Sequence, residues 1–248
     1  MTWSIIARDP ADGAIGIAVA SRFFACGAAV PYVGRRSAVA SQAFCNPVWG
    51  TEGRNRLEAG EEARTVLDDL VARDAGQAIR QCHMMDASGR FAAHTGSGCT
   101  DWAGHLIGDG FCVAGNMLTG SEVIEATAAA FAAHSELPFA HRLLAAMHAG
   151  EDAGGDKRGK QAAGLTIHRG QAHPWLDLRA DDHGDPLTEL DRLLDVAGER
   201  YLFVADEMPT AERFSGLPTR TELDTRIDSE QKRRQQAGQA SRSLASDP

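Results

Sequence analysis

Basic residues and long apolar runs are both scarce in this sequence. The 248 residues include 25 Lys and Arg against 34 Asp and Glu, a formal net charge of -9. Nucleic-acid binders need a basic face to displace phosphate counterions, so this balance argues against a nucleic-acid partner. No stretch approaches the roughly 18 apolar residues that cross a bilayer, and residues 1–9 do not read as a secretory leader. We therefore expect a cytoplasmic protein with no membrane partner.

Cysteines are few, and their spacing fits neither a disulfide framework nor a zinc knuckle. Their number is odd, and no two are separated by two residues. We expect no structural metal and no cofactor, and mostly small buried thiols. The five are Cys26, Cys45, Cys82, Cys99 and Cys112.

Aromatic residues make up only 6% of the chain, whereas 26 residues are Gly and 43% are apolar. That apolar content excludes disorder for the bulk of the chain. Few aromatics and many glycines favour a core of Ala, Val, Ile and Leu layers with close backbone approaches.

The residue pattern alternates groups of strands with pairs of helices. Alternation and turn residues predict strands at about 2–7, 15–20, 37–44, 78–85, 90–95, 103–107, 111–116, 161–168 and 175–180. Apolar stripes and caps predict helices at about 50–59, 63–71, 121–134, 138–150 and 185–203. Hairpins favour antiparallel sheets, and two helix pairs need two surfaces to cover. We predict an α+β fold, a four-layer αββα sandwich of two mainly antiparallel sheets between helical layers.

Three segments follow from this pattern. Residues 1–205 are predicted to form the single sandwich domain, and residues 206–223 a C-terminal extension. Residues 224–248 carry five basic and four acidic side chains with no apolar stripe. We predict a disordered polar tail there.

One face of the strand at 15–20 carries almost no side chain. Gly16, Ala18 and Ala20 alternate with Ile15, Ile17 and Val19. Such a face lets a backbone or a ligand come close, so we expect a substrate to lie against it.

Three motifs suggest chemistry that their context argues against. Residues 154–161 fit a phosphate-binding loop, but Gln161 replaces the hydroxyl residue and the segment precedes a strand. Asp156 in this loop remains a candidate for contact with a substrate. Cys99 and His105 form a candidate thiol–imidazole pair in a Gly-rich connection, but a tight connection with a buried and inert Cys99 explains this segment better. Asp181, Asp182 and His183 suit a divalent cation, but they also suit the start of a helix.

Thr2 is the remaining candidate nucleophile. It begins a predicted strand, and its small side chain permits removal of Met1. The exposed α-amino group, whose reference pKa is about 7.7–8.0, then serves as a general base for the Thr2 hydroxyl.

A family resemblance rests on motifs spread over about residues 2–203. They are Ser4–Asp9, Gly16–Phe24, Ser41–Ala43 with Asn46–Pro47, Thr95–Cys99 with Trp102–His105, Gly115–Leu118, Gly154–Gly159 and Leu178–His183. This ordered set resembles a prokaryotic family, the domain of unknown function 1028 family, that is similar in fold to N-terminal-nucleophile (Ntn) hydrolases. The resemblance implies the αββα sandwich but no substrate, because the family has no settled activity.

The resemblance also implies site residues. Thr2 is then the nucleophile, with Ser21 on the second strand and Arg36 at the start of the third as its catalytic neighbours. The charge of Arg36 or Arg22 would lower the pKa of the Thr2 ammonium group. Ala20 stands where proteasome β subunits of this superfamily carry an acidic residue. Oxyanion donors are expected, by position, among the backbone amides near Ser41 to Ala43 or in the Asn46 side chain. The substrate-binding candidates are Arg22, Ser41, Gln42, Asn46, Thr95, Cys99, His105, Asn116 and Asp156.

Three functional hypotheses follow. One is a thiol or metal site that uses Cys99, His105 or Asp182 and His183, and the other two concern the Thr2 site. The preferred hypothesis is a hydrolase that cleaves a C–N amide bond of a small-molecule substrate, with Thr2 as the nucleophile. The alternative is a scaffold without a working nucleophile that binds a small molecule or supports an assembly. The Ala-rich stretch 126–133 fits packing in a homodimer as well as it fits an internal helix pair.

Overall fold

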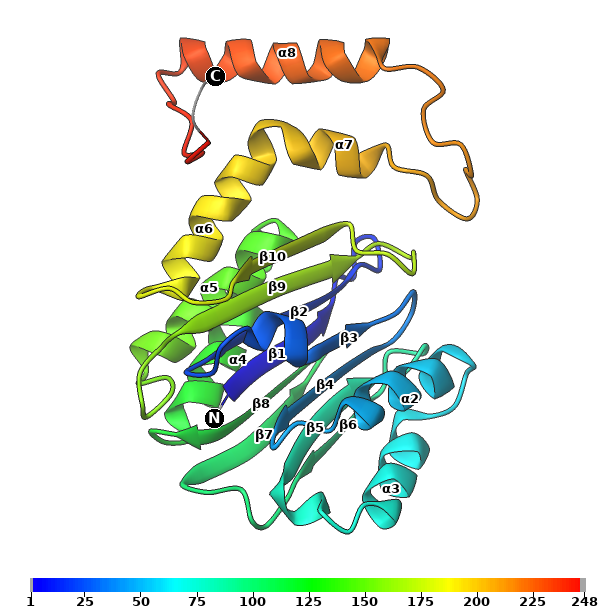
Figure 1. The fold of residues 1–248 in the computed structure, drawn as a ribbon, viewed down its shortest axis with the longest axis vertical. Helices are drawn as coiled ribbons and strands as arrows, with labels where there is room; N and C mark the ends of the chain where they lie inside the picture. The colour runs from blue at the N-terminus through cyan, green and yellow to red at the C-terminus, as the bar shows by residue number, and fades with distance from the viewer. Residues whose placement is uncertain (1, 246–248) are drawn as a thin grey trace. The chain divides into compact units, whose positions relative to one another are not determined.

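The computed structural model describes residues 2–245 and contains two antiparallel sheets (Figure 1). The six-stranded sheet has the order β10 (Leu176–Ala180), β9 (Ala162–His168), β2 (Ile15–Ser21), β1 (Thr2–Arg8), β8 (Phe111–Leu118) and β7 (Trp102–Gly108). The four-stranded sheet has the order β3 (Pro31–Val33), β4 (Ala38–Ala43), β5 (Arg80–Met85) and β6 (Phe91–Thr95).

A pair of helices covers the outer face of each sheet (Figure 1). Helices α4 (Glu122–Ala133) and α5 (Phe139–Asp152) pack on the six-stranded sheet and on each other. Helices α2 (Pro47–Glu58) and α3 (Ala63–Arg73) pack on the four-stranded sheet through a buried cluster that includes Trp49, Leu67 and Met84. The predicted four-layer αββα sandwich is therefore confirmed.

The layer between the two sheets changes from apolar to polar along the strands. Its apolar part includes Ile6, Ile17, Val19, Ala38, Ala40 and Met85. Its polar part contains Ser4, Gln42, Gln81, His83 and Asn116, each at most 1% exposed. Hydrogen bonds among these side chains join the two sheets at the end where β1 begins.

The short helix α1 (Cys26–Ala29) packs against β9. Gly27 and Gly164 meet here backbone to backbone, and a Cβ atom on Gly164 would lie 2.5 Å from the Cα atom of Gly27. Glycine at both positions allows this close approach, which seals the side of the intersheet layer.

The bare face of β2 packs against a helix, so the expectation that a substrate lies there is wrong. A Cβ atom on Gly16 would lie 2.5 Å from Leu143 Cδ1 and 2.9 Å from Phe139 Cε1, both in α5. Ala18 and Ala20 are buried as well. Small residues on this face make room for the helix rather than for a ligand.

A second compact unit begins at Asp191, within α6 (Pro186–Val196). It continues through a π-helical turn (Ala197–Tyr201), α7 (Leu202–Asp206) and α8 (Thr221–Gln236). We predicted disorder from Asp224, whereas α8 extends through this position. Leu223 and Ile227, four residues apart, are buried, and Glu230 pairs with Arg233 and Arg234. No helix among residues 2–245 is long and apolar enough to cross a membrane.

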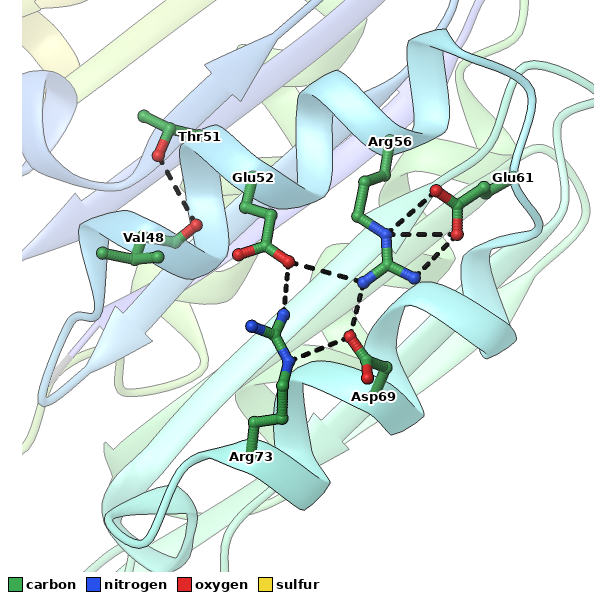
Figure 2. A network of polar contacts seen from close by, with 7 residues as sticks. All are labelled: Val48, Thr51, Glu52, Arg56, Glu61, Asp69 and Arg73. Atoms are coloured by element: carbon green, nitrogen blue, oxygen red, sulfur yellow. Dashed lines mark hydrogen bonds and ion pairs between the residues drawn. The ribbon is translucent and has the colours of Figure 1, made fainter.

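An ion-pair network joins α2 to α3 (Figure 2). The guanidinium group of Arg56 binds Glu61 at 2.7 Å and Asp69 at 2.5 Å, and Arg73 binds Asp69 and Glu52. The hydrogen bonds from Arg56 lower the pKa values of Glu61 and Asp69. A carboxylate whose pKa is lowered in the folded protein stabilises it above the unfolded pKa, and this contribution disappears as the pH falls through the folded pKa.

We predict that Arg56→Met lowers the melting temperature at pH 7 by about 2–4 °C. The deficit should shrink as the pH falls below about 4, where the carboxylates become protonated. Thermal unfolding from pH 3 to pH 8 measures both effects. Arg64→Met is the control, since Arg64 forms only an exposed pair with Asp68. Equal melting temperatures for Arg56→Met and wild type at pH 7 would contradict a stabilising network.

We predict that Gly164→Ala destabilises the protein by about 1–3 kcal/mol, because the methyl group meets the backbone of Gly27. Urea unfolding measures the change. Gly184→Ala is the control, since a Cβ atom at Gly184 has no neighbour within 4 Å. Equal stability of the two variants would show that α1 moves away from β9 without cost.

Candidate functional site

Thr2 is the first residue of β1 and lies between the ends of two neighbouring strands. Its Oγ1 lies 3.1 Å from Ser21 Oγ, at the end of β2. The Asn116 side chain on β8 donates to the main-chain carbonyl of Thr2 at 3.3 Å. Thr2 is 4% exposed, and Ser21 and Asn116 are each 1% exposed. The structure thus brings the predicted Thr2, Ser21 and Asn116 together.

Alternation along β1 points Thr2, Ser4 and Ile6 into the layer between the sheets. Ile6 belongs to the apolar cluster of this layer, and Ser4 forms hydrogen bonds to the smaller sheet. Thr2 therefore lies at the polar end of the intersheet layer.

Gln81 on β5 lies at the centre of the polar end. Its Oε1 accepts from Gln42 Nε2 and from Asn116 Nδ2, both at 2.9 Å. Its Nε2 donates to Thr95 Oγ1 and to the carbonyls of Gly104 and Gly115. Gln81 therefore connects β4, β6, β7 and β8.

Gln42 and His83 form a second branch of the same network. Gln42 Oε1 accepts from Ser4 Oγ at 2.7 Å, so the Ser4 hydroxyl in turn accepts from His83 Nε2 at 2.8 Å. His83 consequently carries a proton on Nε2. Burial lowers the pKa of His83 to about 3, which keeps the ring uncharged at neutral pH.

His105 forms a hydrogen bond with Thr95 and not with Cys99. Its Nδ1 lies 2.9 Å from Thr95 Oγ1, whereas Cys99 Sγ donates to the Arg80 carbonyl. Burial lowers the pKa of His105 and raises the pKa of the Cys99 thiol. A raised thiol pKa reduces the thiolate fraction, which does not suit a nucleophilic cysteine.

Asp156 holds the loop between α5 and β9 against the ends of β2 and β8. Its buried carboxylate accepts from the main-chain nitrogens of Arg22 and Arg158, both at 2.8 Å. It also forms a β-bridge with Leu118. Asp156 therefore fixes the backbone of Arg22 where the chain leaves β2 after Ser21. Because this loop precedes a strand, it lacks the helix N-terminus of a phosphate-binding loop.

Ser41 and Asn46 bind each other and the start of α2. Ser41 Oγ donates to the Asn46 carbonyl, and Asn46 Oδ1 accepts from the nitrogen of Val48 as the N-cap of α2. The Asn46 amide also donates to Asp74. These contacts give both side chains a structural role away from Thr2.

Arg36 lies just before β4, at the end of that strand opposite Gln42. Its main-chain nitrogen and guanidinium group donate to Glu58. The structure does not bring Arg36 to Thr2, because β4 runs the length of the layer between them. Arg22 is the basic residue that adjoins Ser21 in the chain.

Three residues of the polar end were absent from the predicted set: Ser4, Gln81 and His83. Their signal in the sequence is faint. Gln81 and His83 occupy alternate positions in β5, and the residues beside them after Arg80 are Cys and Met. Two polar residues on one face of a buried strand need partners, which indicates a polar network.

Asp182 and His183, two members of the candidate metal cluster, each bind a local partner. Asp182 accepts from Gln161, and His183 Nδ1 accepts from the main-chain nitrogen of Asp185. Within residues 2–245, no group of three His, Cys, Asp or Glu side chains is arranged to hold a metal ion.

Comparisons with known proteins give a family but no activity. No curated protein matches the chain. A crystal structure of protein SPO2555 from Silicibacter pomeroyi, assigned to the DUF1028 family, is similar with a TM-score of 0.80 and 33% sequence identity. The match covers 87% of this chain and 95% of that chain. The model of the family of unknown function DUF1028 matches residues 2–190. The chain therefore belongs to the DUF1028 family of unknown function.

Proposed function

We propose that this protein is an N-terminal-nucleophile hydrolase that cleaves a C–N amide bond of a small metabolite in the cytoplasm. The observation that carries the proposal is the position of Thr2. Its hydroxyl lies at the start of a central strand, 3.1 Å from Ser21 Oγ, with its carbonyl bound by Asn116. The αββα layering supports membership of the Ntn-hydrolase superfamily.

Removal of Met1 turns the nitrogen of Thr2 into a primary amine beside its own hydroxyl. An α-amino group with a pKa of about 7.7–8.0 is partly unprotonated at neutral pH and accepts a proton. Because the α-amino group accepts the proton, no side chain of the polar end has to act as a catalytic base. The neutral His83, which binds Ser4, serves the network instead.

The reaction proceeds through an ester on Thr2. The hydroxyl oxygen attacks the amide carbonyl while its proton moves to the α-amine. The C–N bond breaks as this proton passes to the leaving nitrogen. Water then attacks the ester, releasing the carboxylic acid and restoring the Thr2 hydroxyl. The net change is amide plus water to acid plus amine.

Ser21 orients the nucleophile in this scheme, and Asn116 fixes the adjacent carbonyl. Neither the Ser41 nitrogen nor the Asn46 side chain is assigned as an oxyanion donor, because both are bound within the fold. The nitrogen of Ser41 donates to the Val30 carbonyl, and the Asn46 side chain caps α2.

We predict that the purified protein lacks Met1 and that p-nitrophenyl acetate acylates Thr2. Thr2→Ala should reduce the acylation rate by at least about 1,000-fold, because it removes the attacking oxygen. Thr2→Ser retains the hydroxyl and the amine and should stay within about tenfold. Intact mass and release of p-nitrophenolate measure these outcomes.

Retained Met1, or acylation of Thr2→Ala at the wild-type rate, would reject the nucleophile. Ligand binding by such a protein would favour the alternative, a degenerate scaffold that binds a small molecule.

Arg22 favours a substrate that carries a negative charge. Its side chain is exposed, and its guanidinium group donates to the Arg158 carbonyl at 2.7 Å. Within residues 2–245 no carboxylate pairs with Arg22, whereas Lys157 pairs with Asp101 and Arg158 with Asp156. Arg22 thus retains hydrogen-bond donors for a substrate carboxylate.

We predict that Arg22→Met raises the KM for mono-p-nitrophenyl adipate by about 10–100-fold, the loss of one charge-assisted hydrogen bond. The KM for p-nitrophenyl hexanoate, of the same chain length without the carboxylate, should change little. Lys157→Met is the matched control, since its charge is already paired. Equal effects of Arg22→Met on both esters would remove Arg22 from substrate recognition.

A further inference from the structure

The geometry points to Gln81 as the positioning residue of the site. We propose that its side-chain amide orients Asn116 and, through Asn116, holds Thr2 in the conformation that reacts. This inference rests on the proposed function of Thr2. Gln81 itself makes no direct hydrogen bond to Thr2, so its effect passes through another side chain.

The orientation of the Gln81 amide is determined by its surroundings. Its Nε2 faces three acceptors: Thr95 Oγ1 at 3.0 Å, the Gly104 carbonyl at 3.0 Å and the Gly115 carbonyl at 2.7 Å. A flipped amide would place its oxygen against the two carbonyls, which cannot donate. Oε1 must therefore face β4 and β8.

The Gln81 oxygen in turn determines how Asn116 is oriented. An oxygen that accepts at 2.9 Å requires the nitrogen of Asn116 on that side. The second hydrogen of the same Nδ2 is directed to the Thr2 carbonyl at 3.3 Å. Without Gln81, Asn116 Nδ2 keeps its 3.3 Å hydrogen bond to the Thr2 carbonyl but loses the shorter one at 2.9 Å, so the amide is held less firmly.

Fixing the Thr2 carbonyl constrains the backbone that carries the nucleophile. The hydroxyl lies against Ser21, and the carbonyl is bound by Asn116. Loss of the second contact leaves the hydroxyl and the α-amine less well aligned, and a misplacement of about 1 Å reduces a rate by roughly 100-fold.

Gln42 provides a matched control within the same network. Like Gln81 it is 0% exposed, and the two amides bind each other at 2.9 Å. Both polar atoms of Gln42 are bound within the network, so the structure does not offer it to a substrate, which differs from the expectation drawn from the sequence. Gln42 also contacts Ser4 and the Ala114 carbonyl, but its hydrogen bonds reach neither Asn116 nor Thr2. Replacing either glutamine removes a buried amide, and only replacement of Gln81 frees Asn116.

The experiment compares Gln81→Met and Gln42→Met for acylation of Thr2 by p-nitrophenyl acetate between pH 6 and pH 9. Both variants should melt at lower temperature. Gln81→Met should lose about 10–100-fold in acylation rate and show a shifted midpoint of its pH profile, whereas Gln42→Met should stay within about threefold and keep the wild-type midpoint.

Gln81→Glu provides a second variant in case Gln81→Met does not fold. In its protonated form, the introduced carboxyl group keeps its carbonyl oxygen toward Asn116 and donates one hydrogen toward Gly115. Burial raises the pKa of such a carboxyl group, so the rate of this variant relative to wild type should be near one at pH 6. Above that pKa the second oxygen no longer donates and is repelled by the Gly104 and Gly115 carbonyls, which turns the group away from Asn116, so the relative rate should fall as the pH rises.

Equal rate losses in Gln81→Met and Gln42→Met, or a pH-independent ratio for Gln81→Glu, would overturn the positioning role while leaving Thr2 as nucleophile. Absence of acylation on Thr2 in the wild-type protein would overturn both the proposed function and the positioning role.

Discussion

The buried amide of Gln81 is the constraint on which the arrangement of the site depends. Both of its polar atoms are bound, and its partners come from four strands of the two sheets. A buried polar group left without a partner costs about 1–3 kcal/mol, so the sheets cannot slide past each other without breaking several bonds. The same bonds make one end of an otherwise apolar layer polar, and they extend to the first residue of β1 through Asn116, whose side chain binds the Thr2 carbonyl.

Most of the fold could be predicted from the order and the spacing of its elements. Hairpin turns and two helix pairs led to the four-layer sandwich because each apolar surface needs a cover. The pattern could not identify what covers β2, since small residues admit a ligand and a helix such as α5 equally. It also failed at α8, where only Leu223 and Ile227 signal burial in a highly charged segment.

Site residues could be predicted where their own chemistry or their place in an ordered motif identified them. Thr2, Ser21 and Asn116 were named from the sequence and lie together. Arg36 was placed by analogy, and the length of β4 separates it from Thr2. Gln81 and His83 were missed because partners remote in the sequence determine their roles, and a strand that alternates polar and apolar residues resembles one with a solvated face.

A crystal structure of the protein after reaction with p-nitrophenyl acetate would decide whether Thr2 is the nucleophile. We expect a chain that begins at Thr2, with an acetyl ester on Thr2 Oγ1 and Asn116 still bound between Gln81 and the Thr2 carbonyl. An intact Met1–Thr2 peptide bond with an unmodified Thr2 hydroxyl would exclude Thr2 as the nucleophile.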